Sequence, residues 1–167
     1  MGRDLVFRAS ARLMAMDDAA WARHANPWSG WSRLSVLPLL SVAAWSRIWL
    51  GWGALAPLAL VLVWTWANPR LFPPPASTGS WMSRGVLGER IWLTQGTDPA
   101  FAHHRPMVRA LGLAGALGLG LLLAGLALLA PAPTVAGLAV AMLSKLWLLD
   151  RMVWVHRDAG APGLPPD

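Results

Sequence analysis

Long apolar segments separated by short polar breaks dominate the chain. Residues 107–130 and 134–155 each supply about the 20 helical residues that cross a hydrocarbon core ~30 Å thick. Between Arg33 and Arg70 lie 36 residues (34–69) with a single charge, Arg47. That stretch is too long for one span and just long enough for two spans joined by a tight turn. The pattern therefore predicts an all-α membrane protein, a four-transmembrane-helix bundle built from two helical hairpins.

Prolines, glycines and capping residues mark the ends of these segments. The first turn is expected at residues 49–53, which contain two glycines that can adopt positive φ. The Asn-Pro pair at 26–27 is typical of a helix N-terminus. The Asn-Pro pair at 68–69 is expected to end the second helix, because the residue before proline disfavours the α conformation. A Pro-Ala-Pro break at 131–133 separates the third helix from the fourth.

These boundaries divide the chain into five parts: an N-terminal cytoplasmic or interfacial segment (1–26), a first transmembrane hairpin (27–67), a cytoplasmic loop (68–106), a second transmembrane hairpin (107–157) and a disordered tail (158–167). Within the loop, residues 73–79 predict an extended linker and residues 81–93 a short interfacial helix. Two interpretations stay open for the first 20 residues. They form a weakly amphipathic helix on the membrane surface, or they extend upstream of a start at Met16.

The placement of basic residues predicts the orientation. The regions up to Arg33, from residue 68 to Arg109, and from Arg151 onward hold 12 of the 14 Lys and Arg residues. The turns at 49–53 and 131–133 hold none. Because basic loops stay in the cytoplasm, a multi-pass protein of the cytoplasmic membrane is expected, with the long loop and both the N and C termini cytoplasmic.

Composition narrows the classes of function. The chain is 56% apolar and only 13% charged, and its 12 tryptophans suit the boundary between lipid tails and headgroups. It has no cysteine, which excludes disulfides, thiolate metal ligands and cysteine nucleophiles. The net charge of +6 is attributed to the cytoplasmic loops. The expected partners are therefore the lipid bilayer and its anionic lipid headgroups, not nucleic acid.

Lys145 is the most distinctive polar residue of the apolar segments. A helix starting at residue 134 reaches it after ~16 Å, near the bilayer centre. A lysine there costs at least ~2.5–3.5 kcal/mol, so it should face the bundle, on a stripe with Gly137 and Ala141. Asp150 lies about 140° round the helix and ~7.5 Å along it. The two residues are interpreted either as a structural ion pair or snorkelling lysine, or as a substrate, ion or proton site.

Small residues and one further arginine complete the picture of the spans. Gly112, Ala116, Gly120 and Ala124 form a ridge that lets another helix approach closely, within the bundle or in a homo-oligomer. Arg47 is expected to snorkel to the outer interface.

Catalytic and cofactor motifs are missing from the sequence. No spacing among His24, His103, His104 and His156 is a recognised ligand motif, and the adjacent pair is expected to point in different directions. GxSxG, HExxH and phosphate-loop patterns do not occur. No catalytic residue, no metal and no cofactor is therefore predicted.

Four stretches resemble a family of small prokaryotic integral membrane proteins of unknown function: HANPWS from His24, NPRLF from Asn68, GERIWL from Gly88 and KLWLLDRMV from Lys145. The resemblance covers roughly residues 16–158. It implies no reaction and no ligand. It places the family's polar signatures at His24, Asn26, Asn68, Arg70, Glu89, Lys145 and Asp150, of which all but Asn68 are candidate ligand or ion-pair residues.

Three hypotheses of function follow. The first is a non-enzymatic accessory or interaction protein, with a protein partner or a homo-oligomer. The second is a small transporter or ligand-binding bundle that uses Lys145 and Asp150. The third is a membrane enzyme or cofactor protein with a cytoplasmic-face site built from His24, Glu89 and the histidines at 103–104.

Overall fold

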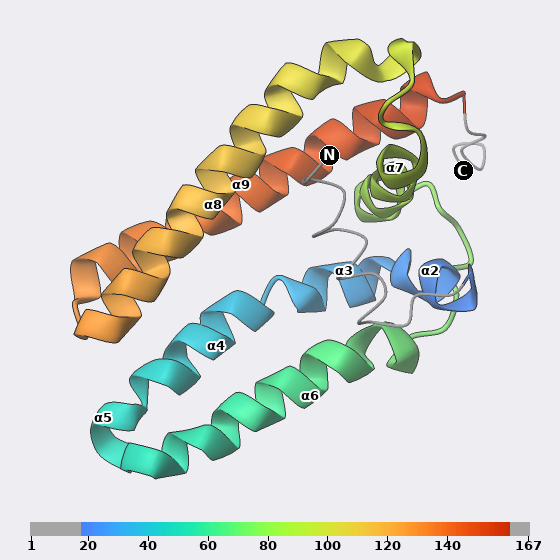
Figure 1. Cartoon of the computed structure of the whole chain (residues 1–167). Helices are drawn as coiled ribbons and strands as arrows, with labels where there is room; N and C mark the ends of the chain where they lie inside the picture. Colours follow the sequence, from blue (N-terminus) through green and yellow to red (C-terminus); the bar gives the residue numbers. More distant parts are fainter. Residues whose placement is uncertain (1–17, 161–167) are drawn as a thin grey trace.

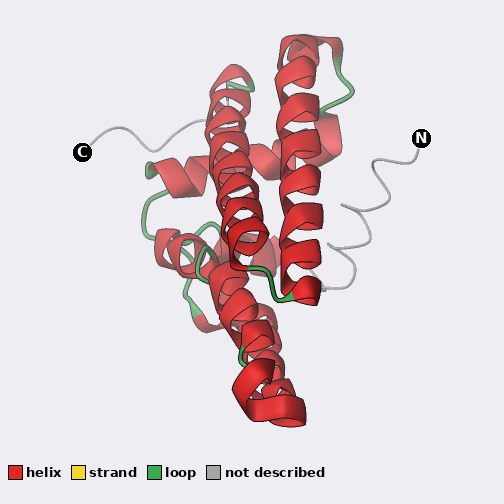
Figure 2. Ribbon diagram, turned by 90° about the vertical axis from the view of Figure 1, so that its left-hand side faces the viewer, coloured by secondary structure: helices red, strands yellow, loops and turns green. Residues whose placement is uncertain are grey.

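The structure of the protein, a computed structural model, describes residues 18–160 (Figure 1). Within that range it consists of helices and their connections, without a strand (Figure 2). Three helical stretches are long and apolar enough to cross a membrane: Pro27–Leu71, Pro99–Leu128 and Pro131–Asp158. At most 22% of each apolar window is buried inside the protein, as expected for helices that face lipid. The prediction of an all-α protein is thus confirmed for the described residues, with three helical stretches that are candidates for crossing a membrane. The first 17 residues and most of the predicted tail lie outside the described residues.

The first apolar stretch folds back on itself. After α2 (Asp18–His24) it comprises α3 (Pro27–Arg33), α4 (Val36–Trp45), α5 (Arg47–Leu50), the 3₁₀ helix η1 (Gly51–Ala54) and α6 (Leu55–Leu71). Gly51 has a φ of 51°, a conformation that residues with a Cβ rarely adopt. The chain reverses there, so α6 returns alongside α4 (Figure 1). The reversal occurs within the predicted turn at residues 49–53.

The N-terminus of α3 is capped as predicted, but α6 ends later than predicted. The Asn26 side chain accepts a hydrogen bond from the backbone N–H of Trp28, and Pro27 occupies the first helical position. By contrast, α6 continues through Pro69 to Leu71. A proline disfavours the helical conformation of the residue before it. In α6 the helix ends only two residues after Pro69, and both Asn68 and Pro69 are fully buried. Packing therefore overrides the local preference.

The second apolar pair packs along its length. α8 (Arg105–Leu128) and α9 (Pro131–Asp158) form an antiparallel hairpin whose turn contains Leu129 at a φ of 52°. The helix backbones approach closely at glycines. A Cβ added to Gly118 would lie 2.6 Å from the Ala141 nitrogen, and one on Gly137 would overlap the backbone of Leu122. Gly137 and Ala141 therefore lie at this interface, as the sequence suggests.

The predicted small-residue ridge on α8 is not the face that packs against α9. Gly112, Ala116, Gly120 and Ala124 are exposed, and a Cβ on Gly112 or Gly120 would meet open space. The packed positions are Leu111, Gly118, Leu122 and Gly125. Steps of four residues advance ~40° beyond a full turn, so such a ridge winds ~120° around the helix over three steps. Steps of seven keep close to one face, and these steps form the observed seam.

Helix α7 (Trp81–Gln95) lies across α9 and contacts α3 (Figure 1). Its Gly85 and Gly88 let the two backbones approach, since a Cβ on Gly88 would overlap the carbonyl of Met152. A helix is therefore present where the sequence predicts one at 81–93, and it is two residues longer. It buries Met82 and Val86 in the protein. The short η2 (Pro99–His104) then leads into α8.

Arg47 joins the two helix pairs at the end opposite α7. Its guanidinium donates to the carbonyl oxygen of Leu126 and, at 3.0 Å, to that of Ala127. These carbonyls belong to the last turn of α8, where backbone acceptors have no partner within the helix. A cation there also complements the helix dipole. Arg47 thus caps α8 from the neighbouring pair. The two pairs meet at α7 at one end and at Arg47 at the other.

Candidate functional site

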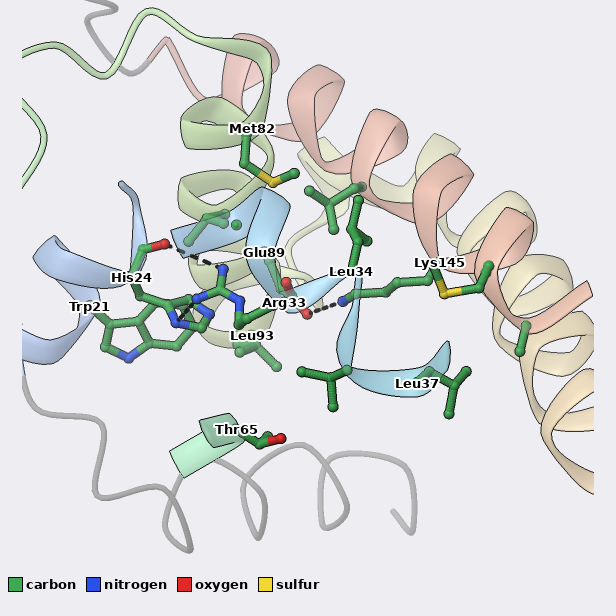
Figure 3. A pocket seen from close by; sticks show the side chains of 16 residues that line it. Trp21, His24, Arg33, Leu34, Leu37, Thr65, Met82, Glu89, Leu93 and Lys145 are labelled. Carbon is green, nitrogen blue, oxygen red and sulfur yellow. Dashed lines mark hydrogen bonds and ion pairs between the residues drawn. The ribbon is translucent and has the colours of Figure 1, made fainter. Parts of the chain in front are cut away.

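A cavity of about 390 Å³ lies where α7 meets both helix pairs (Figure 3). Side chains from α2, α3, α4, α6, α7 and α9 line it. Most are apolar, including Leu34, Leu37 and Met142. Four residues with polar, titratable groups also face it: His24, Arg33, Glu89 and Lys145. Three of these four belong to helices that are far apart in the sequence, and only the fold brings them together.

Lys145 pairs with Glu89, not with Asp150. Its Nζ lies 3.0 Å from Glu89 Oε1, and the side chains are 46% and 21% exposed, respectively. The Asp150 carboxylate instead accepts a hydrogen bond from Trp81 Nε1 at 3.0 Å. The predicted association of Lys145 with Asp150 was therefore wrong. Asp150 lies on another face of α9. Glu89 lies next to Lys145 because α7 crosses α9 closely at Gly85 and Gly88.

Glu89 is ionised in this environment. Burial alone would raise the pKa of its carboxyl group. The Lys145 ammonium, through its charge and its hydrogen bond, outweighs burial, and the charge of Arg33 acts in the same direction. The pKa of Glu89 is consequently lower than its ordinary value.

His24 and Arg33 form a second polar pair in the cavity. Arg33 Nη1 donates to His24 Nδ1, and Nη2 donates to the His24 carbonyl at 3.4 Å. A guanidinium only donates, so Nδ1 must accept, and His24 is a neutral imidazole. Burial, reinforced by the charge of Arg33, lowers the pKa of His24 to about 3. The hydrogen bonding and the pKa agree on its protonation state.

A buried polar network fixes Arg33. Ser29 Oγ accepts from Arg33 Nη1 at 3.1 Å and donates to Asn68 Oδ1 at 2.8 Å. Asn68 Nδ2 donates in turn to Ser32 Oγ at 2.7 Å. Ser29 and Asn68 are completely buried. The network ties α3 to α6 and holds the guanidinium in place beside the cavity.

The remaining candidates from the sequence lie outside the cavity. Asn26, besides capping α3, donates from Nδ2 to the Pro73 carbonyl at 3.0 Å. The Arg70 guanidinium stacks 4.1 Å above the Trp66 ring and donates to the Trp66 carbonyl. Asn26 therefore positions the chain around α3. Arg70 is engaged with its own helix.

Arg33 lines the cavity, although the sequence patterns do not mark it as a candidate site residue. In the sequence it marks only the polar edge of the first span. One signal was available, because Ser29, Ser32 and Arg33 share a helix face at spacings of three and four residues. An arginine behind two serines on an apolar helix indicates a polar network that needs a partner. That the partner is Asn68 could not be inferred from spacing.

Two of the histidines form a separate cluster. His103 Nε2 and His104 Nε2 lie 3.0 Å and 2.9 Å from the same oxygen, Asp158 Oδ2. Their ring centroids are 4.0 Å apart. The prediction that these adjacent side chains point in different directions was wrong. The cluster does not include His24 or Glu89, so the four residues of the enzyme hypothesis do not form one site.

The charges in the cavity leave one positive charge in excess. Arg33 and Lys145 are cations, Glu89 is an anion and His24 is neutral. The cavity therefore offers an apolar volume with a polar edge that favours an anionic group. The Thr65 hydroxyl donates to the Val61 carbonyl of its own helix. Among the described lining residues, none is paired with a base as a nucleophile would be.

Comparison of the chain with known proteins identifies its family, but the function of that family is unknown. The model of a family of unknown function, DUF6653, matches residues 6–166. The match begins upstream of Met16. No curated protein and no solved structure matches the chain.

Proposed function

The chain belongs to the DUF6653 family of unknown function, and we propose that it is an integral membrane protein that binds an amphipathic molecule with an anionic head group. The ligand would occupy the cavity between α7 and the two helix pairs. This is the ligand-binding hypothesis from the sequence, with Glu89 and Arg33 in place of Asp150. Binding, without chemical conversion, is the role we assign.

The proposed membrane arrangement has four crossings. The first apolar stretch turns back at Gly51, so α4 and α6 would each cross once, as would α8 and α9. The end that carries α7 has four arginines (Arg33, Arg84, Arg90 and Arg151), whereas the turn at residues 49–53, at the opposite end, has exposed Trp49 and Trp52. Under the positive-inside rule this distribution supports a cytoplasmic location for α7, η2 and both termini.

The proposal rests on one observation: a mostly apolar cavity is lined by two cations, Arg33 and Lys145, and by one carboxylate, Glu89, which is ion-paired with Lys145. A charged lysine in an apolar helix costs free energy on insertion, and a partly buried ion pair adds little stability in return. Such a pair is typical of a functional site. The excess positive charge selects an anion, and the apolar lining selects a hydrocarbon chain.

The arrangement suggests how each part of the ligand would bind. Arg33 and Lys145 would contact the anionic head, with Glu89 holding the lysine in place. Leu34, Leu37 and Met142 would contact the chain. Because α7 lies at the polar end of the spans, the head group would stay near the membrane surface while the chain points between the helix pairs.

Ligand titration with matched head groups tests this proposal. The protein in nanodiscs of neutral lipid is titrated with a fatty acid and with the fatty alcohol of equal length, and bound ligand is counted by native mass spectrometry. We expect the acid to bind at least tenfold more tightly, and Lys145→Gln or Arg33→Gln to remove most of this preference.

Arg109→Gln is the matched control, because Arg109 is an exposed basic residue near the same end and does not line the cavity. Its preference should equal that of the wild type. Equal binding of acid and alcohol, or an acid preference that survives both cavity substitutions, would overturn the proposal.

A further inference from the structure

We propose that His103, His104 and Asp158 form a binding site for a divalent transition-metal ion of the zinc type. The three residues lie between η2 and the last turn of α9, outside the cavity. One ligand atom from each lies within 4.8 Å of the others. Two imidazole nitrogens and a carboxylate oxygen are a donor set that suits Zn²⁺.

The local structure brings the two histidines to one point. They are the last residues of η2, and α8 begins directly after them. Their rings are tilted by 40° and their centroids are 4.0 Å apart, so both Nε2 atoms face Asp158 Oδ2. Neighbouring side chains on a 3₁₀ helix diverge by about 120°. Their convergence on one carboxylate oxygen is therefore imposed by the packing of η2 against α9.

The three side chains of the cluster differ in burial. The His104 side chain is 2% exposed, Asp158 is 37% exposed and His103 is 60% exposed. The buried histidine is fixed, and the exposed one leaves access for an ion and for a water ligand. His104 Nδ1 is buried without a hydrogen-bond partner among the described residues. Its ring is thus incompletely satisfied by the protein.

The electrostatic environment contains opposing contributions. Asp158 supplies a negative charge, and the C-terminal end of α9 adds the negative end of its helix dipole. The charge of Arg151 also acts on His104 and opposes a cation. The site has three protein ligands, and only one of them is a carboxylate. We therefore predict reversible binding with an open coordination position rather than a closed structural site.

Metal binding at this position would link the two helices of the α8/α9 hairpin at its open end. The turn at residues 129–130 already joins the other end. A ligand that binds only the folded state raises the unfolding temperature, and above its Kd the stabilisation grows with the logarithm of the ligand concentration. Zn²⁺ should therefore stabilise the hairpin, and this effect provides a readout that is independent of any activity.

The test uses the full chain in nanodiscs, purified without a polyhistidine tag and stripped with a chelator. Titration with ZnCl₂ by calorimetry should show one ion per chain and a higher unfolding temperature. His103→Ala and Asp158→Asn should each weaken binding at least tenfold, and both positions are exposed enough for the fold to survive. Co²⁺ should give a visible absorption band that His103→Ala removes.

Asp98→Asn is the matched control, since it removes a carboxylate from the same end while asparagine can retain the N-cap of η2. It should bind Zn²⁺ like the wild type. Absence of saturable binding, or equal binding by the wild type, His103→Ala and Asp158→Asn, would refute the site.

Discussion

Lys145 Nζ lies 3.0 Å from Glu89 Oε1, and the two residues belong to helices that cross rather than to one helix. The lysine projects from an apolar span, and the glutamate from a helix with several charged residues. Glu89 thus holds the Lys145 ammonium at the edge of the cavity, where Arg33 leaves one positive charge in excess. Substitutions of Glu89 and Lys145 should therefore distinguish the contribution of the pair to protein stability from its contribution to anion binding.

We expect Glu89→Gln to lower the free energy of unfolding by roughly 1–3 kcal/mol, because it leaves a partly buried lysine without its anion. The double substitution Glu89→Gln with Lys145→Met should recover most of this loss, since replacing both charges is often neutral. Unfolding in nanodiscs measures both. A double variant less stable than either single variant would contradict this role of the pair. The double variant should still bind the fatty acid with less preference than the wild type, because it lacks the Lys145 ammonium.

Stability should fall as the pH is lowered from 7 to 5. The pKa of folded His24 is about 3, against an ordinary value of 6.5. The unfolded chain therefore binds a proton in this range and the folded chain does not, so stability rises with pH. The carboxyl of Glu89, whose folded pKa is also lowered, extends the loss below pH 4.5. The contribution of His24 should be on the order of 1–2 kcal/mol between pH 6.5 and 5.

His24→Asn isolates this contribution. An asparagine Oδ1 can accept from Arg33 in place of Nδ1, but it does not titrate. The unfolding temperature of the variant should change less between pH 7 and pH 5 than that of the wild type. An identical pH dependence in the two proteins would show that His24 is not held neutral in the folded state.

Local patterns in the sequence predicted the helices and the reversal at Gly51, because apolar length, capping and glycine act within a few residues of one another. They did not predict which residues meet. Closeness in sequence favours Asp150 as the partner of Lys145, whereas Glu89 lies next to Lys145 because α7 crosses α9. The convergence of His103 and His104 on Asp158 depends likewise on packing between distant segments.

The glycines of α7 and α9 should tolerate no side chain, unlike those on the open face of α8. Gly88→Ala and Gly137→Ala each place a methyl group onto the backbone of a neighbouring helix. Each should therefore destabilise the fold by about 1–3 kcal/mol. Gly120→Ala meets open space and should be neutral or stabilising by up to about 1 kcal/mol, because alanine favours helix. Unfolding temperatures that fall equally in all three would contradict this assignment of faces.

Arg47 should hold the two helix pairs together at the end far from α7. Arg47→Gln removes the cation that caps the carbonyls of Leu126 and Ala127, so the distance between the pairs should become longer and more broadly distributed. Because the chain has no cysteine, spin labels on Trp52→Cys and Leu128→Cys report that distance without further changes. Arg109→Gln in the same labelled background should leave the distribution as it was.

The number of membrane crossings can be decided by labelling single cysteines with an impermeant reagent in intact cells. In the four-crossing arrangement, Trp52→Cys and Ala132→Cys lie on the outer side and are labelled, whereas Gly79→Cys lies in the cytoplasmic loop and is labelled only after lysis. If residues 27–71 crossed the membrane once, residue 52 would lie within the hydrocarbon, and Gly79→Cys would be on the side opposite to the start of that span. Twelve basic residues would then be divided between the two sides, against the positive-inside rule. Labelling of Gly79→Cys in intact cells would therefore exclude four crossings with cytoplasmic termini, and with them the cytoplasmic position of the cavity's polar edge.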